Sequence, residues 1–269
     1  MNAPTPPPPA PAAPPRPGDS YVQSFARGLA VIRSFSAAAP RQTLTEVAQR
    51  AGLTRAGARR ILLTLAHLGY VESQGRQFRL TPKILDLGFA YLSSLPLWNL
   101  AEPVMEALVA EVKESCSAAV LDGHDIVYVL RVPTHKIMSI NLGTGSRLPA
   151  YCTSLGRVLL AGLGEDECRQ RLADAPRHAH TARTLVDPGE LQRAVAAART
   201  QGWCLVDQEL EEGLVSLAAP VVDRSGRTIA ALNISGQANR TPPPVMIERF
   251  LPPLRDAALQ ISQLLRVKT

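Results

Sequence analysis

Arginine provides the first chemical clue in this chain. Nine arginines and two glutamates lie between Ser20 and Pro82, a net charge of +7, whereas the whole chain of 269 residues carries +6. Guanidinium groups pair with phosphates and with the edges of guanine bases, so a compact basic segment is typical of a DNA-binding module. The rest of the chain is close to neutral, which indicates a larger part that controls this module.

Seven residues of the basic segment are candidates for contact with DNA. They are Thr43, Thr54, Arg55, Arg59, Arg60, Arg76 and Arg79. The three arginines that follow Thr54 fall in the first two turns of a predicted helix, the part of a recognition helix that enters the major groove. The last two arginines fall in a predicted hairpin, where a wing contacts the DNA backbone or the minor groove.

Polar residues that interrupt apolar patterns in the C-terminal part are candidates for binding a small anion. They are Arg131, Tyr151, Thr153, Ser154, Leu155, Asp207, Glu209, Ser216, Asn233 and Ser235. Strand alternation places Arg131 on the face of Val127 and Val129, beside buried residues, where a carboxylate is its best partner. The start of a helix after Tyr151 offers backbone N–H groups to an anion. Internal salt bridges, helix caps and strand-edge hydrogen bonds are the alternative roles for these residues.

The chain shows no motif for catalysis or metal binding. GxSxG, HExxH and the phosphate-binding loop are absent, and the loop at Gly143–Ser146 lacks the lysine of such a loop. The four cysteines are far apart and form no CxxC pair, so we expect reduced thiols in a cytoplasmic protein. No enzyme activity, metal or cofactor is predicted, and no segment is long and apolar enough for a membrane partner.

The elements that position the basic residues form a predicted winged helix–turn–helix over residues 20–82. Helices are expected over residues 21–36, from residue 44 or 45 after the cap Thr43, and from Thr54 to Gly69. Gly52 ends the second helix and makes the turn. Two short strands are expected around Gln74 and Gly75.

Residues 1–19 and 83–98 flank this unit. The first segment is rich in proline and is predicted to be a disordered tail. The second is predicted to be a linker helix, because residues 83–95 carry two apolar stripes. Two stripes suggest that the helix meets a second copy of itself as well as its own domain, although the monomer alone could cover both.

The remaining residues, 99–269, alternate between predicted helices and strands. Helices are expected over residues 103–114, 153–163, 187–200 and 246–265, and strands over 118–121, 126–132, 137–142, 203–207, 214–222 and 228–235. Hairpins join neighbouring strands, so the fold class is α+β with an antiparallel sheet.

Several long motifs carry a resemblance to a known family. LTEVAQRAGLTRAGARRILLTLAHLGYV, LPAYCTSLGRVLLAGL and DQELEEGLVSLAAPVVDRSGRTIAALNISG resemble IclR-type transcriptional regulators over residues 20–266, and ESCSAAVLDGHDIVYVLRVPT is similar to the branch of PcaR, PcaU and PobR. The resemblance implies a GAF-like effector domain, homodimers or homotetramers on palindromic promoters, and organic-acid effectors. It also implies that Ser154, Leu155, Ser216, Asn233 and Ser235 belong to the effector pocket, together with Asp207 or Glu209.

The resemblance therefore implies a regulator of aromatic-acid catabolism in the β-ketoadipate pathway. Its partners would be double-stranded promoter DNA and an aromatic or dicarboxylic acid such as protocatechuate, 4-hydroxybenzoate or β-ketoadipate, with RNA polymerase as a further candidate. The alternatives are a constitutive DNA-binding protein whose larger domain only oligomerises, and an enzyme for small acids that is tethered to DNA.

Overall fold

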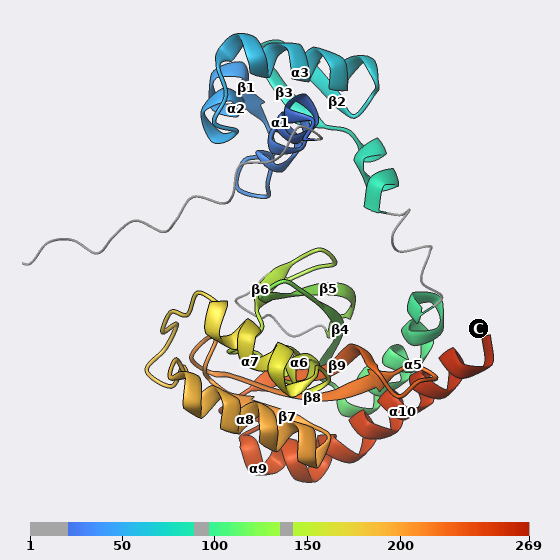
Figure 1. Cartoon of the computed structure of the whole chain (residues 1–269). Helices are drawn as coiled ribbons and strands as arrows, with labels where there is room; N and C mark the ends of the chain where they lie inside the picture. Colours follow the sequence, from blue (N-terminus) through green and yellow to red (C-terminus); the bar gives the residue numbers. More distant parts are fainter. Residues whose placement is uncertain (1–20, 89–96, 135–141, 269) are drawn as a thin grey trace, which may run out of the picture. The chain divides into compact units, whose positions relative to one another are not determined.

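The computed structural model describes residues 21–88, 97–134 and 142–268, which divide into two compact units, Met1–Tyr91 and Leu92–Thr269 (Figure 1). Within the described ranges the units have separate hydrophobic cores. The predicted tail, residues 89–96 of the predicted linker and all but the last residue of the predicted strand 137–142 lie outside these ranges. No helix of the described residues is both long enough and apolar enough to cross a bilayer.

The first unit is a three-helix bundle with a small sheet. Its elements are α1 (Gln23–Arg33), β1 (Gln42–Thr43), α2 (Leu44–Arg50), α3 (Arg55–His67), β2 (Val71–Gln74) and β3 (Gln77–Leu80). The sheet is antiparallel in the order β1-β3-β2, and β2 and β3 form the predicted wing. A 3₁₀ turn at Pro82–Ile84 follows, and residues 85–88 are helical.

Local hydrogen bonds explain where the helices of this unit begin. The Thr43 hydroxyl accepts from the amide of Glu46, whose carboxylate accepts in return from the amide of Thr43, so the predicted capping box is present. The Thr54 hydroxyl accepts from the amide of Gly57 at 3.1 Å and starts α3. Gly52 has φ +64° in the turn between α2 and α3, a conformation that glycine adopts without strain.

Replacing Thr54 with alanine is expected to lower the free energy of opening of α3 by about 1 kcal/mol, because a first-turn amide loses its acceptor. Hydrogen exchange of the α3 amides measures this change. Thr54→Ser keeps the hydroxyl and is the matched control. Equal protection in the alanine and wild-type proteins would show that the cap contributes nothing.

The second unit contains a six-stranded antiparallel sheet between two helical layers. Its elements are α5 (Leu97–Val112), β4 (Ser115–Asp122), β5 (Asp125–Val132), β6 (Arg147–Pro149), α6 (Ser154–Ala161), α7 (Glu165–Asp174), α8 (Pro188–Gln201), β7 (Cys204–Asp207), β8 (Leu214–Val222), β9 (Thr228–Gln237), α9 (Pro243–Val245) and α10 (Leu251–Lys268). The strand order is β6-β5-β4-β9-β8-β7. The predicted α+β class with an antiparallel sheet is therefore confirmed.

Strand alternation gives the two faces of this sheet different neighbours. Helices α5 and α10 lie on one side of the sheet and α6 on the other (Figure 1). On β9, Leu232 and Ile234 belong to the core cluster with α5 and α10, whereas Ala231 belongs to the cluster with α6. Buried alanines on the α6 side, including Ala119 and Ala218, let that helix lie close to the sheet. Every residue of helix α6 is buried, including the charged side chain of Arg157.

Several predicted boundaries in this unit were wrong. Helix α5 begins at Leu97 and contains Pro103, which the sequence placed at the helix start. The closing helical segment starts earlier than expected, at Pro243, and passes through a π-helical turn at Met246–Phe250 into α10. The two prolines that were expected to interrupt it, Pro252 and Pro253, lie in the first turn of α10. Strand β6 and helix α7 of this unit were missed, as was β1 of the first unit, because two- and three-residue strands have no periodicity and α7 is largely polar.

Candidate functional site

The exposed surface of α3 and the wing presents the basic residues of the first unit. Arg55, Arg59 and Arg60 are exposed on α3, and Arg76 is exposed at the tip of the wing. Arg79 forms an ion pair with Glu72, its cross-strand neighbour in the hairpin. The candidate threonines, in contrast, use their hydroxyls as helix caps. The arrangement is that of a winged helix–turn–helix with a basic recognition helix.

Replacing Arg59 with alanine is expected to weaken binding to a specific duplex by about 1–3 kcal/mol, with less effect on random DNA, if Arg59 contacts a base edge. Arg76→Ala should weaken binding to the specific duplex and to random DNA alike, because a wing-tip arginine contacts phosphate. It should also reduce the slope of log affinity against log salt concentration by about one unit. Fluorescence anisotropy at several salt concentrations, with a duplex selected by the wild-type protein from random DNA, measures both. An unchanged affinity for Arg59→Ala would place the recognition surface elsewhere.

The second unit holds an internal cavity between its sheet and the start of α6. The cavity has a volume of about 30 Å³. Its lining residues are Tyr128, Arg131, Leu142, Leu148, Cys152, Thr153, Ser154, Leu155, Val206, Leu210, Leu214, Ser216, Asn233 and Ser235. Among these described residues Arg131 carries the only formal charge, and the other side chains are apolar groups, hydroxyls, the Asn233 amide and the Cys152 thiol.

A bulge in β5 turns Arg131 toward the cavity. The pairing between β4 and β5 shifts at Ala118 and Ala119, so Val129 is an extra residue in its strand. As a result Tyr128 and Arg131 both line the cavity, whereas Val129 lies in the core on the opposite face. The sequence-based placement of Arg131 on the face of Val129 was therefore wrong, because strict alternation does not hold across a bulge.

A chain of polar contacts runs across the sheet from Arg131. The Arg131 guanidinium donates to Ser117 Oγ at 3.2 Å, and the Ser117 amide donates to Asn233 Oδ1 at 3.1 Å. Asn233 Nδ2 donates to Ser216 Oγ and Ser235 Oγ, each at 2.9 Å. The strand register explains why these polar side chains lie in a row, because Ser117 on β4 lies directly opposite both Arg131 on β5 and Asn233 on β9.

The hydrogen bonds in this row of polar contacts identify the Ser154 hydroxyl as a donor at the cavity. Ser216 Oγ accepts from Asn233 and also from Ser235, at 3.2 Å, so both of its lone pairs are used. Its own proton therefore goes to Ser154 Oγ, 2.7 Å away. Among the described residues no acceptor is assigned to the Ser154 proton, so Ser154 has a hydrogen bond to offer at the cavity.

The first turn of α6 adds backbone donors beside Ser154. Thr153 is the N-cap: its hydroxyl accepts from the amide of Gly156 at 3.1 Å and donates to Pro149 O at 3.1 Å. In the described part of the chain no acceptor is assigned to the amides of Ser154 and Leu155. Unpaired first-turn amides and the helix dipole favour an anion or an oxygen-rich group here.

Three other candidates do not line the cavity. The Tyr151 hydroxyl donates to His178 O at 2.6 Å and accepts from the amide of the same residue. Asp207 forms an ion pair with Arg183 near the surface. Glu209 is buried against Arg157. Each of these three candidates is therefore hydrogen-bonded or ion-paired to another protein group. The other seven candidates for effector binding line the cavity.

Sequence reasoning missed the other half of the cavity wall. Tyr128, Cys152, Leu148, Val206, Leu210, Leu214 and Leu142 line it without having been selected. Six of them carry no feature that separates a cavity wall from an ordinary core. Tyr128 offered one signal, a phenol in an apolar strand, since a buried tyrosine hydroxyl usually serves a polar group.

Burial keeps the Tyr128 phenol and the Cys152 thiol of this wall neutral. It raises the pKa of Tyr128 to about 12, an effect that Arg131 partly opposes, so the phenol is protonated at neutral pH. It also raises the pKa of Cys152 to about 12, with a further increase from Glu209. A thiol with this pKa is a poor nucleophile. The described residues also contain no group of three or more histidine, cysteine or acidic side chains that could hold a metal ion.

A winged helix–turn–helix unit with a basic recognition helix, together with a second unit whose cavity combines apolar walls with an arginine and hydroxyl groups, is characteristic of two-domain DNA-binding transcription regulators. Family models agree with this class. The IclR helix-turn-helix domain matches residues 24–75, and the model described as bacterial transcriptional regulator IclR C-terminal matches residues 89–263. The chain belongs to the IclR family of transcriptional regulators.

Individual relatives place the chain near regulators of aromatic catabolism. It is 44% identical to the Pca regulon regulatory protein of Pseudomonas putida, over 88% of this chain and 82% of that protein. It is 35% identical to the p-hydroxybenzoate hydroxylase transcriptional activator of Acinetobacter baylyi, over 91% and 93%. A solved IclR homologue from Microbacterium hydrocarbonoxydans, complexed with 4-hydroxybenzoate, is 27% identical with a TM-score of 0.81, over 91% of this chain and 100% of that one.

Proposed function

We propose that this regulator binds a small aromatic carboxylate in the cavity of its second unit and that binding changes its affinity for promoter DNA. The observation that carries this proposal is the combination on one wall of a single formal positive charge, Arg131, with apolar side chains. An arginine is the best geometric partner for a carboxylate, and apolar walls suit an aromatic ring. The relatives named for the Pca regulon and for p-hydroxybenzoate hydroxylase support the same ligand class.

The polar groups suggest an orientation for the acid. Arg131 and Ser117 would bind the carboxylate, while the Ser154 hydroxyl and the amides at the start of α6 would donate to a ring hydroxyl. Tyr128, protonated at neutral pH, adds a phenol to the wall. This arrangement favours 4-hydroxybenzoate and protocatechuate over a linear dicarboxylic acid such as β-ketoadipate, which has no ring to place between the apolar walls.

The size of the cavity supports a coupling between binding and conformation. Its volume of about 30 Å³ is far below the roughly 300 Å³ of a typical ligand pocket, so the walls must separate to admit an aromatic acid. Ser154 Oγ and Ser216 Oγ, which lie 2.7 Å apart in the cavity wall, would exchange this contact for contacts with the acid. A ligand that binds the opened form preferentially shifts the population toward it, and this is the requirement for control of DNA binding.

The candidate DNA contacts and the assembly remain part of the proposal. Arg55, Arg59, Arg60 and Arg76 would contact DNA, with Arg79 held by Glu72 beside them. A dimer is supported by exposed apolar side chains of the first unit: Val22 is 63%, Phe25 68% and Leu85 70% exposed. A second copy would bury this surface and read the second half of a palindromic site.

Thermal stability in the presence of 4-hydroxybenzoate, protocatechuate, β-ketoadipate and glyoxylate tests the proposal. An acid at 100 times its dissociation constant stabilises the folded protein by about 2.7 kcal/mol. The same acid should change the affinity for the selected duplex. Binding of none of the four acids would contradict the proposal and favour the constitutive DNA-binding protein; formation of a product would favour the enzyme.

A further inference from the structure

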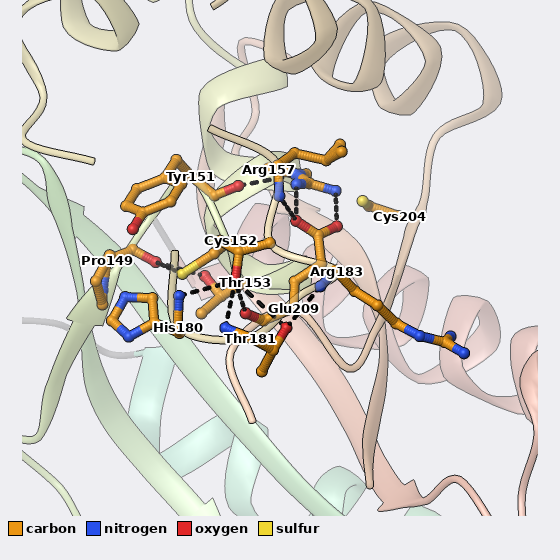
Figure 2. Close-up of polar contacts among 12 residues, drawn as sticks. Pro149, Tyr151, Cys152, Thr153, Arg157, His180, Thr181, Arg183, Cys204 and Glu209 are labelled. Atoms are coloured by element: carbon orange, nitrogen blue, oxygen red, sulfur yellow. Dashed lines mark hydrogen bonds and ion pairs between the residues drawn. The ribbon is translucent and has the colours of Figure 1, made fainter. Parts of the chain in front are cut away.

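An ion pair lies behind the cavity wall without lining it. Arg157 is 3% exposed and Glu209 is 6% exposed. The guanidinium donates to both carboxylate oxygens, Nη1 to Oε1 at 2.7 Å and Nη2 to Oε2 at 2.6 Å (Figure 2). Its Nε donates to the carbonyl oxygen of Tyr151 at 2.9 Å, so two sides of the guanidinium are anchored.

The Glu209 end of the pair has partners of its own. Its Oε2 also accepts from the amide of Leu185 at 2.9 Å, and its carbonyl oxygen accepts from the Thr184 hydroxyl at 2.6 Å. The preceding residue, Gln208, has φ +60° and bonds through its side chain to the amide of Gly213 at 2.9 Å. The ion pair therefore joins three segments, residues 151–157, 184–185 and 208–213.

Two of these segments carry walls of the cavity. The first contributes the polar start of α6, from Cys152 to Leu155, and the third contributes Leu210. A two-pronged guanidinium–carboxylate contact is strongly directional, and it is satisfied in only one arrangement of its two backbones. A buried ion pair adds little net stability compared with apolar residues of the same size. What it provides beyond apolar packing is the fixed geometry between its two side chains.

We infer that Arg157 and Glu209 are a positioning pair, which keeps the start of α6 and Leu210 in a fixed arrangement relative to each other, so that both are correctly placed for the aromatic acid when the rest of the cavity wall opens. Glu209 thus sets ligand affinity without touching the ligand. This inference rests on the proposed function for the identity of the ligand. The positioning of the three segments itself can be measured without any ligand.

A second ion pair joins the same region and serves as a matched control. Arg183 and Asp207 connect the segment before Thr184 to the end of β7. Their side chains are 58% and 25% exposed, and neither residue lines the cavity. Asp207→Asn removes a charge two residues from Glu209 while leaving the buried pair intact.

The ligand experiment compares the full-length wild-type protein with E209Q, R157K and D207N. Calorimetric titration with 4-hydroxybenzoate is done at a temperature at which circular dichroism shows every variant folded. We expect the dissociation constant to rise by about tenfold or more in E209Q and R157K, as for a site whose supporting residues are loosened, and to stay within about twofold in D207N. Equal affinity in E209Q and D207N would overturn the inference.

An apolar double variant, R157M/E209L, separates positioning from stability. Apolar replacement of a buried ion pair commonly preserves folding. We expect this variant to fold and to bind 4-hydroxybenzoate as weakly as E209Q. Wild-type affinity in the folded double variant would show that packing alone positions the walls, and would overturn the inference.

Hydrogen exchange of the ligand-free proteins provides the independent test. In E209Q and R157K the amides of residues 151–157, 184–185 and 208–213 should exchange faster together, while those of α8 keep their wild-type rates. A uniform increase throughout the second unit, or a change confined to the substituted residue, would overturn the inference. If the wild-type protein binds none of the tested acids, the proposed function fails, and this experiment still decides whether the pair positions the segments.

Discussion

Replacing Arg131 with methionine is expected to weaken the binding of 4-hydroxybenzoate by at least about 30-fold. The guanidinium is the only formal charge among the described residues of the cavity wall, and loss of one partner of a desolvated charge pair costs about 2–5 kcal/mol. Methionine keeps much of the side-chain volume, so the fold should persist. Calorimetric titration of the full-length variant, checked by circular dichroism, measures the effect.

A ligand without the carboxylate makes this test specific. 4-Hydroxybenzamide keeps the ring and the hydroxyl but lacks the negative charge, so the wild-type protein should bind it weakly. The Arg131→Met protein should bind it with the same weak affinity as the wild-type protein. Arg227→Met is the control, because Arg227 pairs with Asp223 in the hairpin between β8 and β9 and its side chain is 79% exposed. If the folded Arg131→Met protein bound the acid with wild-type affinity, Arg131 would not be the carboxylate-binding residue. The start of α6 would then be the better candidate for that role.

Replacing Gly156 with alanine is expected to destabilise the second unit by more than about 3 kcal/mol, or to prevent its accumulation. A Cβ at this position would lie 2.1 Å from the carbonyl oxygen of Ala150 and 2.3 Å from its Cα. Both are backbone atoms, and they are held in the buried connection between β6 and α6, so they cannot move aside as a flexible side chain would. Denaturant unfolding followed by tryptophan fluorescence measures the loss.

Gly164→Ala is the matched control for this substitution. Nothing lies within 4 Å of a Cβ at that position, and its φ of −59° is available to any residue. We expect a change of well under 1 kcal/mol there, as for surface substitutions in general. A stable Gly156→Ala protein that binds acid normally would mean that α6 can withdraw from Ala150, and that the position of its first turn is not essential for binding.

The winged unit shows how far local reasoning extends. The caps at Thr43 and Thr54 and the turn at Gly52 each depend on residues within a few positions of one another. Their geometry therefore follows from short stretches of sequence. Exposure of the basic residues could be predicted in the same way, because an unpaired arginine is strongly disfavoured inside a small core.

The cavity required information that no short stretch contains. Arg131 was selected by its charge, but a bulge at Val129, set by pairing with β4, decided which face of the sheet it occupies. Asp207 or Glu209 was expected to face a ligand, but each is paired with an arginine, and Arg157, the partner of Glu209, lies 52 residues earlier in the chain. Apolar wall residues such as Leu210 resemble ordinary core residues until the tertiary structure places them around a cavity.

The sequence by itself determined the charge of the DNA-binding unit, the caps and turn of its helices, and the polar residues that interrupt the strands of the second unit. These properties depend on residue type and on spacings of a few residues. The tertiary structure alone decided which polar residues meet at the cavity, which are joined to one another behind it, and how closely α6 approaches the sheet. Those outcomes depend on strand register and on buried pairs between distant segments, where one shifted residue changes every partner.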